Sequence, residues 1–596
     1  MLANELPLRW LWLAAMTAVA LRGLIVKGWE IGTYLVDSDD ALRLVEVREL
    51  IAGAPWFDTT TLALGGDAGL VSHWSRLVDL PLALLLAGLR LVLPETAAEL
   101  ALRAMWPLIV LAPMLWVLAL ALDRACGRVA AGIGLALAVM SPLGLYQFDP
   151  GRIDHHNVMI AATVSAALMM WAWPKSRTCW TAAGALCALA LAVGYEALAP
   201  VAVVAGVGVV WGLADREQAR AARALVVGLA VTLAAAFVLT VSPTRWFEIR
   251  CDGLSLNLVV LAAIGAAGVV VAFNAGGLAT WHRIGVLAAA GFSGLGIGGW
   301  LEPVCLAGPM AQLPPALGPI WLDLVVETRS VLLEPFLGKF DQAPAVAVFL
   351  AAAVAAQAAR VRRGRSWADM ALLVMVAAFA VLALWQHRFM AYGSFMAVVP
   401  LAMWCAGLGG WRGLQPATVR IAAVVLVSQA FLLGIFKQVD IAAGVAYAKP
   451  AVGRGEMIAN GMACLSMPAL KTLGALPPGL FAAHIDLGAH LAAVTRHRAL
   501  AGPYHRIGDA IIANHEIFAA RSPEAAARLL AAWNVDYVVT CRGLDGPLAR
   551  SKAWQGTLGA DLVAGRAPPY LVPVPLADRD SLYNVWRVER SRLPPD

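Results

Sequence analysis

Charged side chains are scarce in this sequence. Asp, Glu, Lys and Arg together make up 14% of the 596 residues, whereas a soluble domain carries about 25%. Hydrophobic residues make up 60%, and the mean hydropathy is +0.73. This composition excludes a soluble globular protein and predicts a polytopic membrane protein. The net charge of +6 requires no nucleic-acid partner, because the arginines fall in short loops between apolar segments.

Paired cysteine motifs are also absent. The eight cysteines are scattered, with no C-x-x-C pair and no zinc-ligand spacing. We expect most of them to be buried thiols, and Cys464 to pair with Cys541 if that region lies outside the cytoplasm. No small-residue cleavage site follows the first apolar segment, Trp10–Val26, which is therefore predicted to be a retained helix. The sequence contains no internal repeat and no low-complexity tract.

Thirteen apolar segments are predicted to span the membrane: 10–27, 104–121, 129–146, 158–173, 180–194, 198–213, 224–241, 254–273, 285–301, 344–359, 367–385, 391–408 and 419–436. With the N-terminus in the cytoplasm, the basic loops fall on the cytoplasmic face: Arg124 with Arg128, Lys175 with Arg177, Arg216 with Arg220 and Arg223, His282 with Arg283, Arg360–Arg365, and Arg412 with Arg420. This is the positive-inside pattern. It places 28–103, 148–157, 302–343 and the tail on the external face.

The external regions differ in character. Leu77–Leu93 is apolar enough to span, but Asp79, Pro81 and Arg90 interrupt it, so we predict a helix in the outer interface. The chain divides into a transmembrane domain, 1–436, and a smaller domain, 437–596. In the latter, the helix-like run Pro523–Trp533 precedes the strand-like Val535–Thr540, which predicts a small α/β domain.

Acidic side chains and histidines recur in three of these external regions. Carboxylates from separate loops with an imidazole nearby suit Mg²⁺ or Mn²⁺, and the imidazole favours Mn²⁺. Arg388, also external, suits the phosphate of a lipid-linked substrate. The candidates are Asp37, Asp39 and Asp40 after the first span, Asp154, His155 and His156 in F-D-P-G-R-I-D-H-H-N-V (Phe148–Val158), and Glu327 in L-V-V-E-T-R-S (Leu324–Ser330).

Each of these residues also has an ordinary structural interpretation. Asp39 or Asp40 is expected to cap a helix over 41–51, and Asp154 or Asn157 can start the helix that follows it. Glu327 can pair with Arg329, and Arg388 can be a snorkelling interfacial residue. Their occurrence together on one membrane face favours a joint metal-and-phosphate site.

In order, spacing and topology these motifs resemble the catalytic subunit of oligosaccharyltransferase, within the GT-C glycosyltransferase fold. The resemblance runs through most of the chain. It matches Asp37 and Arg43 to the family's first-loop Asp and the Arg six residues later. It matches Pro142, Gly151 and Asp154 to the second motif, with His156 at its second acidic place. L-V-V-E, ending at Glu327, matches the family's T-I-x-E type motif, and Arg388 its phosphate-binding Arg.

The family's W-W-D-Y-G signature corresponds to H-I-D-L-G, His484–Gly488. Asp486 and Gly488 remain, but His484 and Ile485 replace the two tryptophans that help to recognise the Ser or Thr of an N-x-S/T sequon. An aliphatic side chain donates no indole N–H, so a protein acceptor is in question. We expect the tail to bind the acceptor through His484, Asp486, Tyr504, His505 and Arg506.

The resemblance implies a glycosyltransferase that moves a saccharide from a polyprenyl-(di)phosphate donor to an acceptor on the external face. Asp37, Asp154, His156 and Glu327 would hold Mn²⁺ or Mg²⁺, and Asp37, Asp154 and Glu327 would be catalytic, with inversion at the sugar C1. Asp39, Asp40, Arg43 and His155 are secondary candidates. The acceptor is a protein or, alternatively, a lipid or polysaccharide.

Two other classes fit less well. A transporter would carry charges at mid-span and paired repeat halves, and a non-catalytic binding subunit would not need all four residues Asp37, Asp154, Glu327 and Arg388. External metal chemistry favours a bacterial inner membrane, with the C-terminal domain periplasmic.

Overall fold

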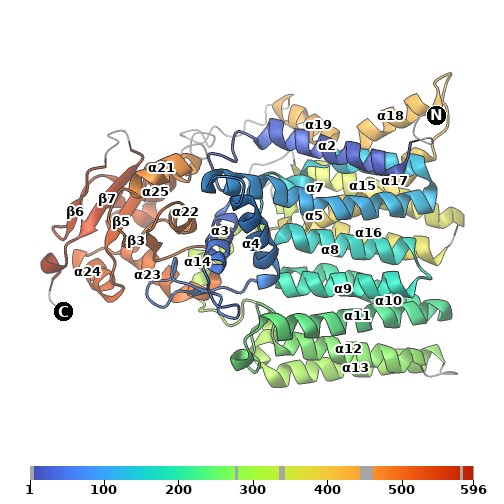
Figure 1. Cartoon of the computed structure of the whole chain (residues 1–596), viewed down its shortest axis with the longest axis horizontal. Coiled ribbons are helices and arrows are strands. Elements are labelled where there is room, and N and C mark those ends of the chain that lie inside the picture. Colours follow the sequence, from blue (N-terminus) through green and yellow to red (C-terminus); the bar gives the residue numbers. More distant parts are fainter. Residues whose placement is uncertain are drawn as a thin grey trace.

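The computed structural model describes residues 6–274, 279–333, 342–364, 366–442, 461–576 and 581–594. The chain forms a bundle of long apolar helices, with a sheet-containing C-terminal region (residues 461–594) beyond one end of that bundle (Figure 1). Helix α2 (Leu8–Lys27) begins at the opposite end of the bundle. The two parts meet where the predicted external loops lie.

Nine helices in the described residues are long and apolar enough to cross a membrane, or up to eleven if each of two bent pairs is one span. The nine are α2, α5 (Glu95–Cys126), η2 with α10 (Tyr195–Ala214), α11 (Arg216–Thr240), α12 (Leu256–Asn274), α13 (Thr280–Leu301), α15 (Gln342–Gly364), α16 (Trp367–Trp385) and η9 with α17 (His387–Ala406). The bent pairs are α6 (Arg128–Val139) with Pro142–Phe148, at 71°, and α18 (Pro416–Val427) with Gln429–Val439, at 56°. The chain is therefore an integral membrane protein.

The count of thirteen spans stays a prediction. Helices α8 (His156–Ala172) and α9 (Arg177–Val193) lie where the fourth and fifth spans are expected, but each has 17 residues. At about 1.5 Å per residue that is about 25 Å, short of a hydrocarbon core of about 30 Å. Almost every side chain of α8 is buried, as expected of a helix that is apolar all round and surrounded by others.

Glycine allows α9 and α11 to pack backbone against backbone. A Cβ added at Gly184 would lie 1.9 Å from the carbonyl oxygen of Leu225, and one at Gly228 would lie 2.5 Å from that of Thr181. Small residues at such contacts let membrane helices approach closely. From the end of α9 the chain turns through η2 (Tyr195–Ala197) into α10 (Leu198–Ala214).

The first external region folds across the end of the bundle. It contains α3 (Ser38–Ile51), a short antiparallel pair, β1 (Thr60–Thr61) with β2 (Leu70–Val71), and α4 (Arg76–Arg90). Figure 1 shows α3 and α4 running across the bundle end rather than along its helices. Helix α4 has 15 residues, fewer than the about 20 that a span requires. Its place in the membrane interface stays a prediction.

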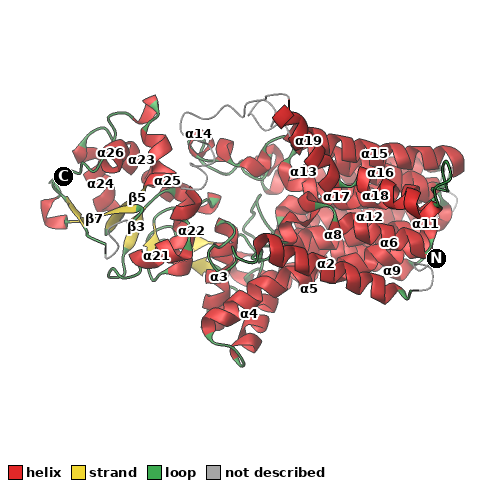
Figure 2. Ribbon diagram, turned by 90° about the horizontal axis from the view of Figure 1, so that it is seen from above, coloured by secondary structure: helices red, strands yellow, loops and turns green. Residues whose placement is uncertain are grey.

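The C-terminal region contains a five-stranded mixed sheet in the order β4-β3-β5-β7-β6. Strand β3 (Leu480–Ala482) runs parallel to β4 (Arg498–Ala499) and β5 (Tyr537–Cys541), while β7 (Tyr583–Val588) runs antiparallel to β5 and β6 (Leu571–Pro573). Figure 2 shows the strands among helices. These are α21 (Met467–Leu473), α22 (Ile485–Val494), α23 (Gly508–Ala519), α24 (Pro523–Ala532), α25 (Arg542–Ala549) and α26 (Leu558–Val563). The expected helix and strand thus appear as α24 and β5.

The cysteines form two disulfides. Cys464 is bonded to Cys541, which confirms the predicted pair. Cys251 is bonded to Cys305, 54 residues later, a pair that the sequence did not predict. Their segments lie beyond the outer ends of α12 and α13, which pack as neighbours, and this brings together two cysteines that are far apart in sequence.

Candidate active site

Asp37 caps the helix that leads away from the site. Its backbone is extended, with φ −146°, and its carboxylate accepts hydrogen bonds of 3.0 Å from the amides of Asp39 and Asp40. The expectation that Asp39 or Asp40 is the cap is therefore wrong, because the helix begins at Ser38 and those residues lie in its first turn. The second oxygen of Asp37 bonds the guanidinium of Arg152.

Asp40 joins this first turn to the segment that carries Asp154. It is fully buried and accepts hydrogen bonds from the amides of Ile153 (2.7 Å) and Asp154 (3.1 Å) and from Arg152 (2.9 Å). Arg152 also donates to Gln147. A carboxylate from residue 40 thus fixes the turn that begins α8, and so sets the position of Asp154 relative to Asp37.

Asp154 lies between two imidazoles. Its carboxylate meets Nδ1 of His155 and, at 2.5 Å, Nδ1 of His156. All three side chains are buried, and candidate ligand atoms from the three lie within 4.8 Å of one another. Within the described residues, the Nε2 atoms of both histidines are buried without a hydrogen-bond partner. This is a group that can hold a metal ion.

Glu327 and Arg388 approach the same place from other elements. Glu327 lies in the short helix η6 (Val326–Thr328), and its Oε2 is 3.7 Å from Nε2 of His156 and 4.0 Å from Arg388. Arg388 precedes α17 (Met390–Ala406), with its side chain 16% exposed. Arg329 instead donates to the carbonyl of Asp323, so the ordinary pairing of Glu327 with Arg329 is not the one formed.

These residues line one cavity of about 1050 Å³, between the bundle and the C-terminal region. Ligand pockets of about 300–1000 Å³ hold drug-sized molecules, so the space suits a saccharide headgroup. The membrane part contributes Asp37, Asp39, His155, His156, Glu327 and Arg388, and the C-terminal region contributes His484, Asp486, Tyr504 and His505.

Negative charge is concentrated on the membrane side of this cavity. Burial tends to raise the pKa of Asp37, but the charge of Arg152 outweighs it and holds that pKa below its ordinary value. Burial also opposes ionisation of Asp154, but the neighbouring His155 and His156 hold its pKa well below the ordinary value. Burial and the charges of Asp154 and Asp37 raise the pKa of Asp39 well above its ordinary value.

The secondary candidate Arg43 joins two helices of the first external loop. Arg43 is fully buried outside the cavity, where it bonds Asp79 of α4 and, at 3.3 Å, Glu46. Its guanidinium lies 4.4 Å from the ring centre of Trp74. Arg43 therefore joins α3 to α4, whereas Arg152 is the arginine in contact with Asp37.

The C-terminal candidates meet the cavity in different ways. His484 caps α22 by accepting from the amide of Asp486 at 3.2 Å, and Asp486 is about half exposed. Tyr504 is buried and donates from its hydroxyl to the carbonyl of Ser38 at 2.6 Å. Its ring also packs edge-on against Trp74. Tyr504 thus joins the C-terminal region to the residue next to Asp37.

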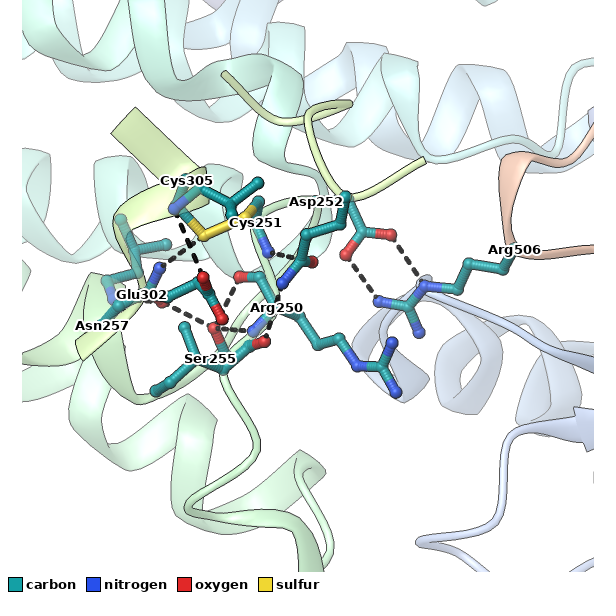
Figure 3. Close-up of a disulfide and its surroundings, with 12 residues drawn as sticks. Arg250, Cys251, Asp252, Ser255, Asn257, Glu302, Cys305 and Arg506 are labelled. Atoms are coloured by element: carbon teal, nitrogen blue, oxygen red, sulfur yellow. Dashed lines mark hydrogen bonds and ion pairs between the residues drawn. A yellow bond between two sulfur atoms is a disulfide. The ribbon is translucent and has the colours of Figure 1, made fainter. Parts of the chain in front are cut away.

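Asp252, from the loop before α12, binds the segment that follows Tyr504. Its carboxylate accepts from His505 at 2.5 Å and from Arg506 at 2.8 and 3.0 Å. Figure 3 shows Arg506 reaching Asp252 from the C-terminal region, with the Cys251–Cys305 disulfide beside that aspartate. The side chain of Arg506 therefore joins the C-terminal region to the membrane part of the protein.

Sequence reasoning did not assign a role to Arg152, Glu196 or Asp252. Arg152 stands in the motif that carries Asp154, and Glu196 is the one acidic residue between the predicted spans 180–194 and 198–213. Their positions at the predicted external ends of spans were a signal that could have identified both residues. The partners of Asp252 lie more than 250 residues away, and no local pattern indicates them.

Comparisons with known proteins bear on the fold. No family model and no curated protein sequence matches the chain. Solved structures of a membrane oligosaccharyltransferase do match it. One is AglB of the archaeon Archaeoglobus fulgidus in complex with an inhibitory peptide and a dolichol-phosphate, with a TM-score of 0.64 and 15% identity, over 98% of this chain and 75% of that one.

Two further structures of the A. fulgidus enzyme agree. The apo form has a TM-score of 0.64 at 16% identity, over 94% of this chain and 73% of that chain. A form tethered to an acceptor peptide containing the NVT sequon has a TM-score of 0.60 at 15% identity, over 98% and 75%. The resemblance inferred from the motifs is confirmed at the level of the fold: this chain shares the architecture of an oligosaccharyltransferase.

Proposed function

We propose that the protein is a membrane glycosyltransferase. It transfers a saccharide from a polyprenyl-(di)phosphate donor to an acceptor on the external face of the membrane. The observation that carries this proposal is the meeting of Asp37, His156, Glu327 and Arg388, from four separate segments, at one cavity, with Asp154 directly behind His156. The fold is shared with oligosaccharyltransferase.

The donor set fits a divalent cation. Nε2 of His156 is buried, faces Glu327 and has no hydrogen-bond partner in the part of the chain that the structure describes, and unpaired buried polar atoms call for a ligand. Asp37, Asp154, His156 and Glu327 would hold Mn²⁺ or, less suited to imidazole, Mg²⁺. When bound, the ion supplies positive charge to the phosphate of the leaving group.

Arg388 completes the phosphate side of the site. Its guanidinium lies at the cavity wall beside Glu327 and is suited to phosphate oxygens. As the bond between the sugar C1 and the phosphate oxygen breaks, the electron pair of that bond stays with the phosphate, and Arg388 stabilises the added charge. The lipid chain would lie along the helices below.

Asp37 is positioned to act on the acceptor. The acceptor attacks C1 from the face opposite the phosphate, which inverts the anomeric centre. If the acceptor is a hydroxyl, its proton passes to Asp37, whose low pKa keeps it ionised. If the acceptor is an amide, Asp37 and Glu327 hold its N–H groups, and closure of the loop around Glu327 shields the site from water.

The test is transfer in a reconstituted system. Purified protein with Mn²⁺, a lipid-linked oligosaccharide and a fluorescent N-x-T peptide should give a mobility shift that Asp37→Ala and Glu327→Gln abolish. Glu217→Gln is the matched control, because Glu217 forms an exposed ion pair with Lys175 far from the cavity. A fully active Asp37→Ala protein would refute the assignment.

The second candidate changes the acceptor to a lipid or a polysaccharide. It is favoured by the H-I-D-L-G sequence, in which His484 uses its ring to cap α22 and Ile485 offers no donor. Donor hydrolysis that requires metal and Asp37, without transfer to the peptide, is the result expected of this alternative.

A further inference from the structure

His155 and His156 are related by an unusual arrangement, because each imidazole lies between two carboxylates. Both Nδ1 atoms face Asp154. Nε2 of His155 faces Oε2 of Glu196 at 3.8 Å, and Nε2 of His156 faces Oε2 of Glu327 at 3.7 Å. A neutral imidazole has a single N–H, so it can donate to only one of its two carboxylates. The second carboxylate therefore faces either an imidazolium N–H or a bound cation.

The gap between His155 and Glu196 has the character of a ligand site. Nε2 of His155 and Oε2 of Glu196 are both buried without a hydrogen-bond partner in the described residues, and His155 is 2% exposed. Their separation of 3.8 Å exceeds that of a hydrogen bond. With metal bonds of about 2.0–2.2 Å, an ion can contact both atoms.

The side chains of Glu196 and His155 are closely packed by neighbouring residues. Glu196 lies in η2, the turn between α9 and α10. A Cβ at Gly194 would lie 2.8 Å from Oε2 of Glu196 and 2.9 Å from Cδ2 of His155, so only glycine leaves room for the pair. On its other side, the ring of His155 packs against Trp74, with centroids 5.3 Å apart.

Carboxylates also outnumber guanidinium groups at this wall. Those at or directly behind it are Asp37, Asp39, Asp40, Asp154, Glu196 and Glu327, against Arg152 and Arg388. The surroundings of His155 and Glu196 are therefore acidic overall.

We propose that Nε2 of His155 and the carboxylate of Glu196 bind a second divalent cation, separate from the one that Asp37, Asp154, His156 and Glu327 hold. One imidazole and one carboxylate, with water, select a transition ion such as Mn²⁺ over Mg²⁺. The inference goes beyond the proposed function, because it concerns the ions that the chain binds and holds for any acceptor.

Metal binding itself tests this. The full-length protein in detergent is dialysed against Mn²⁺, and bound Mn²⁺ is counted per chain. Two equivalents are expected for the wild type and one for Glu196→Gln, while Asp37→Ala should retain the equivalent at His155.

Controls separate this from misfolding and from the proposed activity. Glu95→Gln removes an exposed carboxylate paired with Arg90 and should bind two equivalents. Glu196→Asp keeps the charge but shortens the side chain, so it should weaken one equivalent at least about tenfold. A wild type that binds one equivalent, or a folded Glu196→Gln protein that binds two, overturns the proposal. Neither result depends on glycosyl transfer.

Discussion

Asp252→Asn should release the C-terminal region from the membrane part of the protein. Asp252 is 9% exposed and Arg506 13% exposed, and the carboxylate accepts from both Arg506 and His505. The variant keeps the shape of the side chain but removes its charge, which leaves a nearly buried guanidinium facing a neutral amide. Breaking such a pair by removing one partner costs about 3–5 kcal/mol.

A second contact across the same boundary provides the control. Asp67 pairs with Arg498 at 3.1 Å, but the two side chains are 66% and 36% exposed. Exposed pairs contribute about 0–1 kcal/mol, so Asp67→Asn should change little. The two variants each remove one carboxylate charge from the interface and differ mainly in burial.

Hydrogen exchange over residues 502–507 measures the local opening directly. At about 1.4 kcal/mol per tenfold, Asp252→Asn should speed exchange there at least about 100-fold, and Asp67→Asn less than about tenfold. The pKa of Asp252 lies below its ordinary value because the hydrogen bonds from His505 and Arg506 outweigh its burial. The stabilisation is therefore present above about pH 4 and is lost as the pH falls further. Equal exchange in the two variants would refute the reasoning.

Three further predictions concern stability and donor binding. Burial and the charge of Asp79 raise the pKa of Glu46 to about 8, so the native state holds a proton that the unfolded chain releases above about pH 4.5. The thermal midpoint should therefore fall as the pH rises from 5 to 8 in the wild type and stay flatter in Glu46→Gln; parallel profiles would contradict this. Replacing Cys251 and Cys305 with serine opens a 54-residue loop and should cost about 2–4 kcal/mol of unfolding free energy, seen as a lower melting temperature than that of the non-reduced wild type. Arg388→Ala should raise the KM for the lipid-linked donor at least about tenfold, with Arg388→Lys intermediate; an unchanged KM would remove Arg388 from the phosphate site.

Hydropathy predicted the membrane character of the chain because each apolar helix is a local pattern. The acids were also found locally, since Asp37 and Asp154 stand at the outer ends of predicted spans. The helix cap was misassigned because V-D-S-D-D offers three carboxylates within four residues. Only the extended backbone of Asp37, set by its tertiary contacts, decides between them.

The rest of the site depends on contacts that no short pattern records. Arg152 meets Asp37 and Asp40 across more than 110 residues. Cys251 meets Cys305 because α12 and α13 are neighbours. Asp252 meets Arg506 across 254 residues. Such pairs can be identified only from the packing of the helices and the position of the C-terminal region in the folded structure.

The hydroxyl of Tyr504, bound to the carbonyl next to Asp37, has a consequence for biosynthesis. During translation the proposed metal ligands of the membrane part emerge long before residue 504. A nascent chain with these segments inserted thus already carries Asp37, Asp154, His156 and Glu327. The cavity closes only when the C-terminal region has folded, so under the proposed function the ion can bind before the acceptor is enclosed.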